Sequence, residues 1–243
     1  MFVDGIAKCT RYAFGPNRLH LCGPDANREI FAYMAAGHSD KGLSNLLVQF
    51  KTMHPYLKKI AEANRIKDPF DERVVEAYWV GNNLLENVGK KQFYSHLVDG
   101  LKINKLLTIK EFRRASEKLN FGARMHHSFH VFNIWKRTGN DSSLHTLQSM
   151  DKCRISWGEI ITIDGPLITV RTKPLIFDGN NKLILGNEID IKIARKLNDD
   201  YIAEIKPGEI ISMHWDTPCE ILTGRQREYL EKYTVLSLGL ANR

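Results

Sequence analysis

The sequence lacks the features that mark membrane, secreted and disordered proteins. No apolar run approaches the roughly 18 residues of a membrane-spanning helix. The N-terminus, Met1-Phe2-Val3-Asp4, has neither the basic nor the apolar region of a signal peptide. Only four cysteines occur in 243 residues, too few for a disulfide scaffold. Internal repeats and low-complexity segments are also missing. These absences predict a cytoplasmic protein with reduced thiols and no membrane contact.

The composition is that of a globular protein with a basic surface. Apolar residues make up 43% of the chain and charged residues 26%, enough to bury a core and solvate a surface. The formal net charge of +7 suits an acidic protein partner or a nucleic acid. However, no RNA-binding aromatic motif, basic-region helix or zinc-finger spacing is present. The sequence therefore disfavours a nucleic acid as the partner.

Helical patterns dominate the first 145 residues. Residues 1–25 contain two turn-forming groups, Gly15-Pro16-Asn17 and Gly23-Pro24-Asp25, and are predicted to form an irregular lead-in. Asp68-Pro69 suits the cap and first position of the clearest helix, and Thr108-Ile109-Lys110-Glu111 has the form of a capping box. Apolar spacing predicts helices at about residues 26–36, 40–50, 55–61, 69–88, 92–101, 108–119 and 125–135.

The pattern changes after a polar, turn-rich segment at residues 138–143, which is predicted to be an interdomain hinge. Short β-branched runs separated by turn signals then favour a small barrel. The predicted strands are residues 159–163, 167–172, 175–177, 182–185, 188–194, 201–205 and 209–213, and a final helix follows Thr223. The predicted fold class is α+β. An all-α domain covers residues 1–145, and an OB-like β-barrel with a C-terminal helix covers residues 150–243.

Three histidines gather in one predicted helix. His126 and His130 are four residues apart and so share one helical face, which is the spacing of paired zinc or iron ligands. His127 lies beside them and can add a further ligand. The glutamate of the metalloprotease motif is missing, and apolar neighbours make buried core histidines the alternative interpretation. Cys9, His20 and Cys22 can also ligate a metal, but their spacing is that of ordinary structural residues.

A cysteine and a histidine flank the predicted strands. Cys153, between Lys152 and Arg154, comes just before the first strand, and His214 ends the last one. If the barrel closes, the start of the first strand and the end of the last lie together. A thiolate and an imidazole suit iron, zinc or copper, although two ligands are too few for a closed structural site.

Two motifs around these residues occur in the order and spacing of a known family. The first is Cys153-Arg154-Ile155-Ser156-Trp157-Gly158, followed by residues 160–164 and Gly165. The second runs from Gly208 to His214 and leads into Glu220-Ile221-Leu222. Residues 153–233 thus resemble the HypC/HupF-type chaperones of nickel–iron hydrogenase maturation. In that family the cysteine is the second residue of the chain and a proline stands at the place of Trp157.

The resemblance implies a function. It predicts an OB-like barrel with a C-terminal helix and assigns to Cys153 and His214 the binding of iron with its cyanide and carbonyl ligands. The predicted partner is a hydrogenase large subunit or another maturation factor. The helical part resembles an uncharacterised prokaryotic family found beside hydrogenase genes, which implies no mechanism.

Two other functions remain open from the sequence. One is a metalloenzyme that uses His126 and His130 with a carboxylate such as Glu76 or Glu86 and keeps a coordination position for substrate. The other is a nucleic-acid-binding module, since small OB-type barrels bind single strands and the chain is basic. A chaperone or metal carrier is the favoured interpretation over an enzyme.

Overall fold

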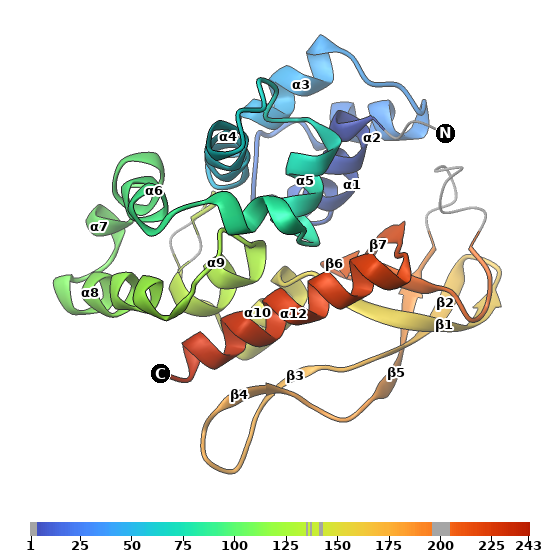
Figure 1. Ribbon diagram of the computed structural model, residues 1–243. Helices are drawn as coiled ribbons and strands as arrows, with labels where there is room; N and C mark the ends of the chain where they lie inside the picture. Colours follow the sequence, from blue (N-terminus) through green and yellow to red (C-terminus); the bar gives the residue numbers. More distant parts are fainter. Residues whose placement is uncertain (1–3, 135, 137, 141–142, 196–204) are drawn as a thin grey trace.

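The computed structural model describes residues 4–134, 136, 138–140, 143–195 and 205–243. Helices fill the N-terminal part, an antiparallel sheet follows, and a long C-terminal helix crosses the middle of the molecule in Figure 1. This arrangement confirms a mixed fold with the helices concentrated before the strands. Within the described residues, no helix is long and apolar enough to cross a bilayer.

The helices lie close to their predicted positions. Thr108 and Thr223 each cap a helix by a reciprocal side-chain and backbone exchange, with Glu111 and Gln226 as the partners. The predicted helix at 69–88 is divided, because Gly81 adopts φ +100° and ends its first half. The α-helices are α1 (Gly5–Asn17), α2 (Asn27–Ala35), α3 (Lys41–Val48), α4 (Met53–Ala63), α5 (Glu72–Trp79), α6 (Lys90–Ser95), α7 (Ile103–Leu106), α8 (Ile109–Glu117), α9 (His127–Ile134), α10 (Leu147–Cys153) and α12 (Gly224–Ala241), joined by short helical segments η1 (Asn83–Asn87), η2 (His96–Gly100) and η3 (Lys118–Phe121).

The prediction of an irregular lead-in is wrong for α1. Asp4 caps this helix through its side chain, and Gly15 and Pro16 lie in its last turn. Gly15 allows α1 to pack closely against β6, because a Cβ at this position would lie 2.5 Å from the carbonyl oxygen of His214. The absent side chain lets α1 lie directly on the backbone of the sheet.

Five strands form one antiparallel sheet in the order β5-β2-β1-β6-β7. They are β1 (Ser156–Asp164), β2 (Leu167–Thr172), β5 (Ile189–Ala194), β6 (Ile210–His214) and β7 (Thr217–Ile221), and a separate hairpin pairs β3 (Leu175–Phe177) with β4 (Leu183–Leu185). Within the described residues no pairing of β5 with β7 closes the sheet, so the OB-like barrel stays a prediction. Most of the strand predicted at 201–205 lies outside the described residues.

The turn between β6 and β7 has an unusual sequence. Trp215 and Asp216 both have positive φ values, +51° and +56°, as the two central residues of a type I′ hairpin turn do. Asn and Gly usually fill such turns, which explains why β7 carried no sequence signal. The Trp215 N–H donates to the Lys152 carbonyl oxygen at 2.8 Å, and Asp216 forms an ion pair with the Lys152 ammonium at 2.5 Å. The hairpin is therefore attached to the end of α10.

One hydrophobic core joins the helical part to the sheet. Tyr12 and Trp79 from the helices belong to the same buried cluster as Cys219 of β7 and Tyr233 of α12. A second cluster lies on the sheet itself, and a third fills the space between α9, α10, the β3–β4 hairpin and α12. The residues on either side of the predicted hinge are thus packed against one another, and the candidate site lies where they meet.

Candidate metal centre

Three potential metal ligands converge where α9, α10 and β6 meet. One ligand atom from each of His127, Cys153 and His214 lies within 4.8 Å of the other two. These residues open α9, end α10 and end β6, respectively. Cys153 was expected just before a strand but is the last residue of a helix, three positions before β1. The predicted meeting of Cys153 with His214 is present, and His127 joins them as a third potential ligand.

The attachment of the β6–β7 turn to α10 explains the convergence. Lys152 holds the turn by its carbonyl oxygen and its ammonium group, as described above. Its chain neighbour Cys153 is consequently brought beside His214, the residue before the turn. The juxtaposition of Cys153 and His214 thus depends on contacts between the end of α10 and the β6–β7 turn, and it does not require closure of a barrel.

The His214 ring is prepared to accept a ligand. Its Nδ1 lies 2.6 Å from the Tyr12 carbonyl oxygen. A carbonyl oxygen only accepts, so Nδ1 carries the proton and Nε2 keeps a lone pair. Nε2 is buried and has no hydrogen-bond partner, and the side chain is 2% exposed. Burial lowers the pKa of His214 to about 4, against the opposing effect of the Tyr12 and Cys153 backbone carbonyls, so the ring is neutral at pH 7. The Cys153 carbonyl does not reach Nε2 with the geometry of a hydrogen bond. An imidazole that donates one N–H to a carbonyl and presents the other nitrogen is the common arrangement of metal-binding histidines.

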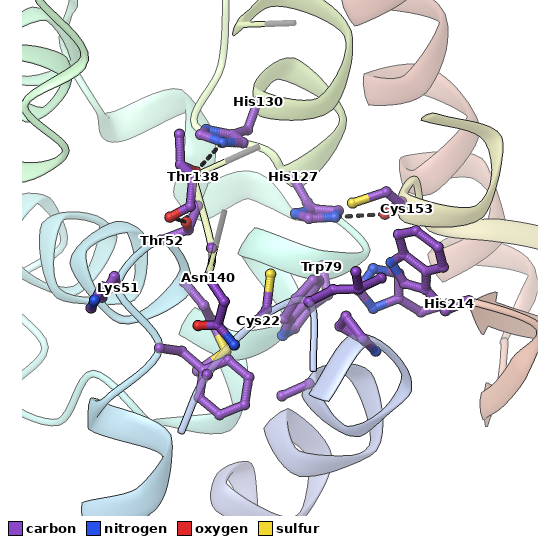
Figure 2. A pocket seen from close by; sticks show the side chains of 18 of the residues that line it. Cys22, Lys51, Thr52, Trp79, His127, His130, Thr138, Asn140, Cys153 and His214 are labelled. Atoms are coloured by element: carbon purple, nitrogen blue, oxygen red, sulfur yellow. Dashed lines mark hydrogen bonds between the residues drawn. The ribbon is translucent and has the colours of Figure 1, made fainter. Parts of the chain in front are cut away.

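His127 lies between two hydrogen-bond partners. Its Nε2 donates to the Cys153 carbonyl oxygen at 2.7 Å, and its Nδ1 accepts from the Tyr78 hydroxyl at 3.0 Å. Figure 2 shows the first of these contacts, with the Cys153 sulfur beside the same ring. Burial lowers the pKa of His127 well below its usual value, and the neighbouring His214 ring lowers it further. If Nε2 ligates a metal, its proton has to move to Nδ1 and its hydrogen bond to the Cys153 carbonyl oxygen is lost. Nδ1 then donates to the Tyr78 hydroxyl oxygen.

The structure places His126 and His130 outside this group. The His126 Nδ1 accepts the Ser128 N–H at 3.2 Å, and its ring stacks on Tyr233. Its Nε2 is buried without a hydrogen-bond partner, as in His214, but no thiol or carboxylate of the described residues groups with it. Both nitrogens of His130 have hydroxyl partners, Tyr56 at 3.2 Å and Thr138 at 2.7 Å. Burial lowers the pKa of each ring to about 3. Both therefore behave as neutral core histidines, the alternative that their apolar neighbours favoured.

The carboxylates named with these two histidines also have other partners. Glu76 contacts Lys8 and Gln226, whereas Glu86 contacts Arg124, Lys232 and Tyr233. Across the described part of the chain, neither carboxylate joins a group of potential metal ligands. The structure therefore does not assemble a metal site from His126, His130 and these glutamates.

Comparison with known proteins places the chain in a family. The model of a family of unknown function, DUF6390, matches residues 1–243. The chain belongs to this family. No match was found among curated proteins or among solved structures. The family model covers the helical part and the sheet together, and the shared core joins the same two parts. The description of the family gives no activity.

The ligand group of this DUF6390 chain opens onto a pocket of about 60 Å³. Tyr78 lines it together with the three potential ligands. Figure 2 shows Trp79, Cys22 and His130 in the same wall. The Trp79 ring contacts both His127 and His214, with centroid separations of 4.7 and 5.4 Å. Tyr78 has the helical spacing of a core residue, and no sequence signal indicates a role at the site for Tyr78 or Trp79. Their place beside the imidazoles follows from packing between distant segments.

The donor set of this DUF6390 chain restricts the metals that suit it. One thiol and two neutral imidazoles are ligands for zinc, iron or copper, and not for magnesium or calcium, which prefer oxygen. Three protein ligands leave a tetrahedral ion with one further position. The apolar walls limit water around the group and strengthen its electrostatic interactions.

Proposed function

We propose that this protein binds a transition-metal ion through Cys153, His214 and His127 and delivers it to a partner. Two observations carry the proposal: the buried His214 Nε2 makes no hydrogen bond of normal geometry, and one potential ligand atom of His214 lies within 4.8 Å of one in Cys153 and one in His127. Buried polar atoms are normally paired, and an unpaired one costs about 1–3 kcal/mol. A bound metal ion would satisfy this atom.

The resemblance to hydrogenase maturation chaperones suggests the cargo. It implies that the cysteine and the histidine hold iron with cyanide and carbonyl ligands, and these two side chains do meet here. The five-stranded sheet supplies the strands from which an OB-like barrel would form. We therefore propose iron as the metal and nickel–iron hydrogenase maturation as the role.

The partner follows from the same proposal. A carrier has to dock on the protein that receives its cargo, which would be a hydrogenase large subunit or another maturation factor. The net charge of +7 would steer the chain toward an acidic surface on that protein. Such steering weakens as salt screens the charges.

The test is metal analysis with infrared spectroscopy of protein purified without oxygen, together with Cys153→Ala and His214→Ala. We expect iron with cyanide or carbonyl bands in the wild type and the loss of both signals in the two variants. Co-expression with the hydrogenase maturation proteins gives the chain access to its cargo.

His130→Ala is the matched control, because His130 lies in the same pocket wall but outside the ligand group. It should retain the metal. Metal without the infrared bands would keep the ligand group and reject hydrogenase maturation. Wild-type protein that stays free of metal after co-expression and after incubation with iron or zinc would overturn the proposal.

A further inference from the structure

A second thiol lies in the wall of the metal pocket. Cys22 belongs to the bend after α1, where its carbonyl oxygen accepts the Asn17 side-chain N–H at 2.9 Å. Gly139 packs against the sulfur on one side, since a Cβ there would lie 2.5 Å from it. Cys22 and Cys153 line the same pocket, in which His127 and His214 also lie (Figure 2). The two thiols thus come from segments 131 residues apart in the chain.

The charge balance of the pocket favours a second thiolate ligand. A divalent ion held by one thiolate and two neutral imidazoles keeps a net charge of +1. Among the described residues that line the pocket there is no Asp or Glu, while Lys51 adds a positive charge. An uncompensated charge costs much free energy in apolar surroundings. A second thiolate would bring the bound ion and its ligands to neutrality.

We propose that Cys22 is the fourth ligand and that metal binding closes the site as two thiolates and two imidazoles. This inference rests on the proposed metal-binding function. The Cys22 sulfur is not part of the 4.8 Å ligand group, so it has to move closer to the other three ligands when the ion enters. Both thiols lose a proton on binding, and the product is a neutral complex of the divalent ion with two protons released to solvent.

The experiment is a titration of the fully reduced protein with Co²⁺, comparing wild type, Cys22→Ser and Cys153→Ser. Thiolate-to-cobalt charge-transfer absorption per bound ion reports the number of sulfur ligands. We expect this absorption to fall by about half in each variant, because each keeps one of two thiolates. Proton release, measured in weak buffer, should fall from about two per ion to about one.

Cys219→Ser is the control, since Cys219 is a buried cysteine that does not line the pocket. It should retain the full absorption. Unchanged absorption and unchanged proton release in Cys22→Ser, with the loss confined to Cys153→Ser, would reject Cys22 as a ligand. It would leave the fourth position to an exogenous molecule and favour a metalloenzyme. Wild-type protein that binds no Co²⁺ would contradict the metal site itself.

Discussion

Two buried polar clusters connect the helices to the sheet, and they differ in how completely they are paired. In the first, the Lys8 ammonium of α1 lies 3.3 Å from both Glu76 of α5 and Glu220 of β7. In the second, the ligand group of His127, Cys153 and His214 contains an imidazole nitrogen without a partner. Tyr12 contacts both clusters, because its hydroxyl donates to Glu220 and its carbonyl accepts from His214.

The difference separates a structural role from a ligand-binding role. Lys8 is 2% exposed, yet its carboxylate neighbours compensate for its charge, and Gln226 completes the shell of Glu76 at 2.8 Å. Burial lowers the pKa of Lys8, but Glu220, Glu76 and Glu72 raise it more, so the ammonium stays charged. The ligand group instead contains neutral rings and, on His214, a nitrogen that makes no hydrogen bond of normal geometry. The first cluster should therefore govern stability, and the second should govern binding.

Acid should produce the largest effect, through the buried neutral histidines. Their pKa values are lowered in the folded state, so the unfolded chain binds more protons below about pH 6.5 and stability falls with pH. For each such ring, the free energy of unfolding falls by about 1.4 kcal/mol per pH unit below the unfolded pKa, until the pH reaches the folded pKa of that ring. These values are about 3 for His96, His126 and His130 and about 4 for His214, while that of His127 is lowered well below its usual value.

Urea unfolding at pH 7, 6 and 5 measures this loss. Stability that stays constant between pH 7 and pH 5 would contradict the neutral state of these rings. His96→Gln removes one ring whose pKa burial lowers to about 3, so the dependence of stability on pH should decrease by about one proton per chain below about pH 6. This ring lies outside the ligand group, so the variant does not alter the metal site.

Lys8→Met tests the paired cluster. It leaves Glu220 buried without its cation, and breaking such a pair costs about 3–5 kcal/mol. The loss should be seen in the free energy of unfolding measured with urea at pH 7. Lys59→Met, which breaks the partly exposed pair with Glu62, is the control and should cost less than about 1 kcal/mol. Equal losses of unfolding free energy in the two variants would contradict the structural role of the Lys8 cluster.

Tyr78→Phe tests how the ligand group is oriented. The variant removes the hydroxyl that contacts the His127 Nδ1, so zinc affinity should fall about 10-fold, as for other groups that position a ligand. Competition with a coloured chelator measures the affinity. Tyr56→Phe removes a similar hydroxyl from His130 and should leave the affinity unchanged. If both variants bind zinc as the wild type does, Tyr78 has no positioning role.

Local signals in the sequence were enough to predict much of the fold. The capping patterns at Thr108 and Thr223 mark helix starts that the structure confirms, and β2 and β3 have their predicted bounds. These features depend on neighbouring residues alone. By contrast, the sequence does not predict α1, because Gly15 and Pro16 form turns elsewhere, whereas here Gly15 packs against His214, 199 residues away in the chain.

The site was partly predictable for the same reason. Cys153 and His214 were named from motifs at the ends of strands, which is where the structure places His214. Helical spacing predicts His126 and His130 as paired ligands. In the structure, packing places His127 beside the thiol, and His126 and His130 contact other partners. Which face of a short helix meets a distant loop cannot be derived from spacing within that helix.

A zinc titration of Lys8→Met and His214→Gln, carried out side by side with the wild type at a temperature where all three are folded, tests the central claim most directly. We predict that Lys8→Met binds one ion with an affinity within about fivefold of the wild type despite its lower stability. His214→Gln should lose at least about 100-fold in affinity, a loss no smaller than those caused by groups that only position a ligand. Equal zinc affinity in the wild type and His214→Gln would contradict the assignment of the unpaired nitrogen as a metal ligand.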